Sequence, residues 1–134
     1  MKMNGLKDIA KEIMAAVCSV FGFVFGDWDG LMAALIILII MDYVSGVIAA
    51  IAEKKLSSAV GAKGIAKKVF MLLIVAMANV ADINIIGEGH VLKSVTAMFY
   101  AANECISLLE NAGRLGVPVP KKLLDVLEQL KEDK

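Results

Sequence analysis

Residues 31–52 read LMAALIILIIMDYVSGVIAAIA, an apolar run of 22 residues whose only charge, Asp42, lies near its centre. A helix rises about 1.5 Å per residue and the hydrocarbon core of a bilayer is about 30 Å thick, so this run can cross a membrane. A carboxylate in the middle of such a helix costs roughly 2.5 kcal/mol or more on insertion scales. Asp42 therefore needs a partner, a proton or water.

The composition of the whole chain is that of an integral membrane protein. Of its 134 residues, 59% are hydrophobic, whereas soluble domains are about 45–50% apolar. The 14 basic and 14 acidic residues give no net charge, so no global field favours nucleic acid as a partner. Cys18 and Cys105 lie among apolar residues, and we expect them to pack as small hydrophobic side chains. At this length we expect one domain.

Apolar stretches at about 13–26, 31–52, 69–86 and 91–109 predict the membrane segments. The last three are long enough to be clear spans. The first has only 14 uncharged residues after an amphipathic start, so it is either a short span or a helix that lies in the interface. After residue 116, the spacing of Leu123, Leu127 and Leu130 predicts a short amphipathic helix.

The predicted fold class is therefore an all-α integral membrane protein. It has three clear transmembrane helices, a short N-terminal amphipathic or spanning helix and a C-terminal cytoplasmic amphipathic helix. We expect residues 1–116 to form the membrane domain and residues 117–134 to form the C-terminal helix.

A basic loop orients these segments. The polar stretch Glu53–Lys68 carries five lysines and one acid, and an excess of lysine marks cytoplasmic loops. These lysines are Lys54, Lys55, Lys63, Lys67 and Lys68. If the first segment spans, both termini are cytoplasmic and every turn obeys the rule. The alternative is three spans with an interfacial N-terminal helix.

Two carboxylates are predicted to lie near the middle of the membrane. Asp42 is 11 residues from the outer end of its span and Glu104 is 13 residues from the outer end of its own, so their depths differ by roughly 3 Å. No basic residue is expected at that depth. The two acids are then either protonated and hydrogen-bonded, or they face water in an oligomeric lumen. A third possibility is that each bonds a polar residue on a neighbouring helix, with Ser45, Asn79 and Asn103 as candidates.

Other polar and small residues add to this pattern. Asp82 and Lys93 share a shallow layer, where they either pair across the intervening turn or reach the interface separately. Gly46 and Ala50 form a small-xxx-small pair for close helix packing. The candidate pore-lining or switching residues are Asp42, Glu104, Asn103, Asn79 and Asp82.

The sequence contains no combination of a nucleophile and a base, and its one histidine, His90, lies in a predicted outer turn. A metal site needs several convergent ligands. We therefore predict that the chain is not an enzyme and has neither a metal nor a cofactor.

Two blocks of the sequence resemble the phage holins of the toxin secretion/phage lysis family. The first is MDYVSGVIAA (41–50) followed by KKLSS (54–58) and GAKGIAKK (61–68). The second is NECISLLENAGRLGVPVPKKLLDVLEQLK (103–131), which is similar to the N-E-x-x-S-x-x-E-N block, the G-x-P-x-P motif and the lysine-rich helix of that family. Together they cover about half of the chain.

This resemblance implies a non-enzymatic, homo-oligomeric pore former of the bacterial cytoplasmic membrane. Such holins assemble with copies of themselves among membrane lipids and release an endolysin or a large toxin. Two other functions stay open. One is a small ion channel or transporter subunit that uses midplane carboxylates. The other is an anti-holin or membrane tether that acts through residues 117–134.

Overall fold

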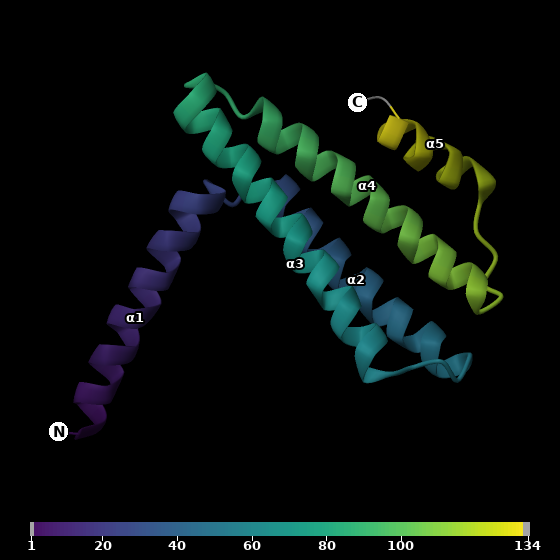
Figure 1. Ribbon diagram of the computed structural model, residues 1–134, viewed down its shortest axis with the longest axis horizontal. Coiled ribbons are helices and arrows are strands. Elements are labelled where there is room, and N and C mark those ends of the chain that lie inside the picture. The colour runs from purple at the N-terminus through teal and green to yellow at the C-terminus, as the bar shows by residue number, and fades with distance from the viewer. Residues whose placement is uncertain (1, 133–134) are drawn as a thin grey trace.

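The computed structural model describes residues 2–132 (Figure 1). This part of the chain contains five α-helices and one π-helical segment joined by short connections. No strand occurs in this part of the chain, so the all-helical prediction is confirmed. The predicted C-terminal helix is present, although residues 133–134 of its segment, and residue 1 of the membrane domain, lie outside the described residues. The elements are α1 Lys2–Phe25, α2 Gly30–Ala52, α3 Ser58–Ala81, η1 Asp82–Ile86, α4 Val91–Arg114 and α5 Lys121–Glu132.

The centre of the molecule is a bundle of α2, α3 and α4. These helices have 23, 24 and 24 residues, so each is about 35 Å long and matches the thickness of a bilayer core. α4 is the central helix of the bundle, because α2 and α3 each pack more extensively against α4 than against each other. The apolar core consists of Met32, Leu35, Ile39, Val75 and Ala97.

Small residues let α2 approach α4 closely. A Cβ atom added to Gly46 would lie 3.5 Å from Nδ2 of Asn111 on α4. Ala50, one turn further along α2, is also buried. The Gly46–Ala50 pair thus lies on the packed face of α2, where small side chains bring backbones together.

The outer surface of this bundle is apolar. Large hydrophobic side chains on α2 and α3 are half exposed or more, among them Ile37, Ile40, Ile48, Val69, Leu73 and Met77. Charged side chains, by contrast, are buried between the helices at Asp42, Asp82, Lys93 and Glu104. This inverted arrangement suits a helical bundle whose solvent is lipid.

α3 begins eleven residues earlier than the predicted span at residue 69. The hydroxyl of Ser57 accepts a hydrogen bond from the backbone N–H of Val60 at 3.2 Å and so caps the first turn. The prediction of a basic loop is therefore wrong for Lys63, Lys67 and Lys68, which lie on α3. Only Lys54 and Lys55 lie in the connection between α2 and α3.

Two helices in the described part of the chain are long and apolar enough to cross a membrane, Gly30–Ala52 and Ser58–Ile86. The sequence predicted a third clear span, and α4 does not reach that standard. Its length is sufficient, but its residues are less apolar on average than those of α2 and α3.

α1 is a continuous helix of 24 residues rather than a short one. It projects away from the bundle (Figure 1), and among the other helices it contacts α3. Its side chains are exposed from Met3 to Phe23 and half-buried at Val24 and Phe25.

Candidate functional site

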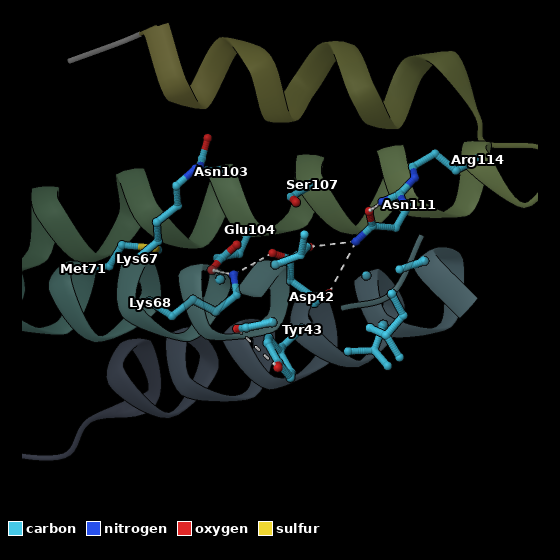
Figure 2. Close-up of a pocket in the computed structure, with 17 residues that line it drawn as sticks. Asp42, Tyr43, Lys67, Lys68, Met71, Asn103, Glu104, Ser107, Asn111 and Arg114 are labelled. Atoms are coloured by element: carbon cyan, nitrogen blue, oxygen red, sulfur yellow. Dashed lines mark hydrogen bonds and ion pairs between the residues drawn. The ribbon is translucent and has the colours of Figure 1, made fainter. Parts of the chain in front are cut away.

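A buried cluster of three charges joins α2, α3 and α4 at the middle of the bundle (Figure 2). The ammonium group of Lys68 donates hydrogen bonds to Oδ2 of Asp42 at 2.7 Å and to Oε1 of Glu104 at 2.6 Å. Asp42 is only 6% exposed and Glu104 only 2%. We call Asp42, Lys68 and Glu104 the central charge cluster.

The cluster lies at half the length of each helix. Asp42 is the thirteenth of 23 residues in α2, Lys68 is the eleventh of 24 in α3 and Glu104 is the fourteenth of 24 in α4. The sequence placed both carboxylates at one depth, and the structure brings them to the same ammonium group. The expectation that no basic residue shares that depth is wrong, because α3 starts at Ser58 and carries Lys68 into the bundle.

Asn111 on α4 extends the network from the cluster toward the end of the bundle. Its amide Nδ2 donates to Oδ1 of Asp42 at 3.1 Å and to the hydroxyl of Ser45 at 2.8 Å. Asn111 is thus the polar partner of the Asp42 carboxylate on a neighbouring helix. Ser45, a predicted partner, lies on the same helix as Asp42 and donates to its backbone carbonyl at 2.9 Å. Asn79 and Asn103, the other predicted partners, bond neither carboxylate among the described residues. Asn111 was not among the predicted site residues.

An exposed ion pair ends this network. Arg114 donates to Oδ1 of Asn111 at 3.0 Å through Nη1 and to Oε1 of Glu53 at 2.6 Å through Nη2. The hydrogen bond from Arg114 lowers the pKa of the Glu53 carboxyl, and the same bond raises the pKa of Arg114. Both groups therefore stay charged at neutral pH.

A cavity of about 410 Å³ opens between α2, α3 and α4 beside the central charge cluster. Its walls include Tyr43 of α2, Lys67 of α3, and Asn103 and Ser107 of α4. Gly61 and Gly64 leave room for the ring of Tyr43, whose hydroxyl lies 3.3 Å from where a Cβ of Gly61 would stand. Asn103, a predicted pore-lining residue, lines this cavity and is partly exposed.

A second polar cluster lies at the opposite end of the bundle and consists of Asn79, Asp82 and Lys93, which we call the capping cluster. Both oxygens of Asp82 accept backbone N–H groups at the start of α4, from Leu92 at 3.1 Å and from Lys93 at 2.8 Å. Asp82 thus satisfies two of the donors that a helix N-terminus leaves free. Of the two alternatives predicted for Asp82 and Lys93, the ion pair does not form among the described residues, since Asp82 contacts Lys93 through the backbone N–H of that residue.

The other two members of the capping cluster hold the end of α1. The ammonium group of Lys93 donates to the carbonyl of Asp27 at 3.1 Å. The amide of Asn79 donates to the carbonyl of Val24 at 2.9 Å, and its Oδ1 is buried without a partner among the described residues. Gly26, with φ +74°, is required here because a Cβ would stand 2.7 Å from that oxygen.

These features are those of a class of protein: a small helical membrane protein whose buried charges are hydrogen-bonded inside the bundle. Within the described residues, no group of three or more His, Cys, Asp or Glu side chains could hold a metal ion. The model of the bacteriophage holin family matches residues 19–132. The chain therefore belongs to the bacteriophage holin family.

One named relative agrees with this assignment, and others are similar over most of the chain. The chain is 35% identical over 99 residues to a probable holin of Bacillus phage phi105, which covers 74% of this chain and 73% of the relative. It is 37% identical over 135 residues to an uncharacterised protein of Halalkalibacterium halodurans, with 98% of both chains covered. An uncharacterised 14.9 kDa protein of Clostridium perfringens is 35% identical over 98% of this chain and 100% of its own length. No solved structure matches the chain.

Proposed function

We propose that this chain is a holin that oligomerises in the bacterial cytoplasmic membrane, permeabilises it and releases an endolysin or a toxin. The observation that carries the proposal is the inverted bundle of a holin-family chain. Its helices are as long as a bilayer core is thick, its charges are paired inside and its apolar side chains are outside. Water as the only solvent would disfavour this surface.

Several copies must take part. Three or four helices of one chain cannot surround a hole wide enough for a protein, so a protein-sized lesion needs a homo-oligomer. In this assembly α4 crosses the membrane with α2 and α3, because α4 has the same length and packs against both. The lysine-rich connection between α2 and α3 then faces the cytoplasm by the positive-inside rule, with the C-terminus on the same side.

The alternative of a small ion channel relied on carboxylates that have no basic partner. Lys68 contacts both Asp42 and Glu104, so these acids already have a cation in the single chain. We therefore propose that the central charge cluster stabilises the packing of α2, α3 and α4. Its action as a switch would consist of a rearrangement of these three side chains.

The test is induced expression in bacteria that also carry a cytoplasmic endolysin. We expect a potentiometric dye to report collapse of the membrane potential, followed by lysis that depends on the endolysin. Cells that accumulate the chain in their membranes and keep both their potential and their endolysin would contradict the proposal. Selective ion flux without release of the endolysin would instead support the channel alternative.

A further inference from the structure

The C-terminal helix α5 is amphipathic, and it lies beside a membrane-length helix although one of its faces is charged. After Arg114 the chain turns back, and α5 runs alongside α4 (Figure 1) and packs against it. Lys121, Lys122, Asp125 and Glu128 of α5 are all exposed. Charged side chains are costly in hydrocarbon, so the side of α4 that carries α5 does not suit lipid.

The N-terminal half of α3 has two exposed faces of opposite character. Ile65 and Val69 are each 51% exposed, and Leu73 continues the same apolar stripe at a spacing of four residues. Lys63 and Lys67, also four residues apart, are exposed on a different face of the same helix. Both faces are at similar positions along the helix, so depth in the membrane does not explain the difference.

The cationic face of α3 is continuous with α4. Lys67 lines the cavity together with Asn103 and Ser107, and Figure 2 shows Lys67 and Asn103 reaching toward the side on which α5 lies. Lys68 and Arg114, the other cations of the cavity wall, are engaged in ion pairs. No ion pair involving Lys67 occurs among the described residues, so its charge needs water.

We propose that the α4–α5 side and the Lys63–Lys67 face of α3 line an aqueous lumen between copies of this chain. The exposed apolar side chains of α2 and the Ile65–Leu73 stripe of α3 face lipid. This assignment rests on the proposed holin function and specifies which surface meets water in the assembly. It moves the lumen from the buried candidates Asp42 and Glu104 to Lys63 and Lys67, and it keeps the predicted candidate Asn103.

Single cysteines on α3 test the assignment at matched depth. Cys18 and Cys105 are first replaced by alanine, and Lys67→Cys is compared with Val69→Cys, and Lys63→Cys with Ile65→Cys. A charged, membrane-impermeant methanethiosulfonate reagent is added to induced cells that lack an endolysin. The cysteine thiolate, which forms in water and not in hydrocarbon, attacks the sulfur of the reagent, forms a mixed disulfide and displaces methanesulfinate. We expect the two lysine positions to react more than about tenfold faster than their partners.

Equal rates within each pair would overturn the proposal, whether both members react quickly or neither does. Rapid labelling of all four positions would mean that this half of α3 lies outside the membrane. Rapid labelling of Val69→Cys and Ile65→Cys alone would mean that the lipid and water faces are reversed.

A second pair of variants does not depend on the cysteine-free background. Lys67→Glu keeps a charge on the proposed lumen face, and Val69→Glu places one on the proposed lipid face. We expect Lys67→Glu to accumulate in membranes at the wild-type level and Val69→Glu to fall at least severalfold. Equal accumulation would overturn the proposal. Cells that keep their membrane potential while wild-type chain accumulates would instead count against the holin function, because the accumulation of the two glutamate variants can be measured without depolarisation.

Discussion

The central charge cluster and the capping cluster both bury polar groups between helices, but they satisfy those groups in different ways. In the central charge cluster, side chains neutralise side chains, since one ammonium group of Lys68 binds Asp42 and Glu104. In the capping cluster, side chains satisfy the backbone at helix ends, as Asp82 does for α4 and Asn79 does for α1. The first depends on charge and the second on hydrogen-bond geometry.

This difference teaches that an intramembrane charge need not mark a pore. Removing one member of a buried ion pair leaves an uncompensated charge, whereas removing a cap leaves unpaired amide groups. The central charge cluster should therefore be the more sensitive of the two. The following variants separate the clusters, from the largest expected effect to the smallest.

Lys68→Met should cause the largest loss. It leaves Asp42 and Glu104 buried without a cation, which we expect to destabilise the bundle by about 3–5 kcal/mol. The loss would appear in the unfolding of purified protein in detergent, followed by circular dichroism. Lys67→Met is the matched control, because the neighbouring lysine makes no such ion pair among the described residues. A Lys68→Met variant as stable as Lys67→Met would mean that the cluster carries no net stabilisation.

Neutralising both acids should rescue that variant. Lys68→Met combined with Asp42→Asn and Glu104→Gln no longer buries a charge, and replacing a whole buried ion pair with neutral groups is often close to neutral. We expect the triple variant to regain most of the stability lost by Lys68→Met. If the triple variant is less stable than Lys68→Met alone, the account of charge neutralisation is wrong.

Asp82→Ala should have a smaller effect, of about 1–2 kcal/mol, because it removes the acceptor of two backbone N–H groups at the start of α4. Asp82→Asn keeps one carbonyl oxygen and should lose less. Hydrogen exchange would show faster exchange at the amides of Leu92 and Lys93. Unchanged exchange at both amides would count against the capping role.

Asn79→Leu should leave the stability of the bundle within about 1 kcal/mol of wild type. The variant loses the bond to the Val24 carbonyl but also removes a buried oxygen that has no partner, and these two effects oppose each other. We expect α1 to be freed, with a broader distribution of spin-label distances between α1 and α3. Asn84→Ala is the control, since the side chain of Asn84 in η1 bonds locally, to the backbone carbonyl of Val80 in the adjoining α3. Distances as narrow as those of the control would contradict the tethering role of Asn79.

Glu53→Gln should produce the smallest change, because the pair with Arg114 is exposed. The pKa of Glu53 is lowered in the folded chain from its ordinary value of 4.5. Its contribution is therefore present above that value and is lost as pH falls through the lowered pKa. The difference in melting temperature between wild type and Glu53→Gln should be constant above about pH 5.5 and vanish at lower pH. A difference that grows on acidification would have the wrong sign.

The presence of the helices was predictable from the sequence because hydrophobic run length and helical spacing are local signals, but the start of α3 was not. Counting residues from the outer ends of the two spans also predicted that Asp42 and Glu104 lie at a similar depth in the bundle. The position of Lys68 inside the bundle was not predicted, because the uncharged run begins at Val69. Lys68 was therefore interpreted as the last residue of a loop. Ser57, whose hydroxyl caps α3, is the signal that could have placed Lys68 inside the bundle.

Partners that meet only through the packing of distant segments were less predictable. Asn111 bonds Asp42 across 69 positions of sequence, and Asn79 bonds Val24 across 55. An asparagine in an apolar helix indicates a buried hydrogen bond but does not identify its partner. The position of α5 beside α4 likewise depends on the turn after Arg114, and its amphipathic pattern alone did not predict it.

The most direct test of the account is release of a folded protein from lipid vesicles that contain only this chain. Vesicles loaded with both a small dye and a fluorescent protein of endolysin size would be compared as the ratio of chain to lipid is raised. The account predicts that, above a threshold density, both cargoes leave. Retention of the protein at every density, with or without leakage of the dye, would contradict the formation of a protein-sized lesion by this holin-family chain.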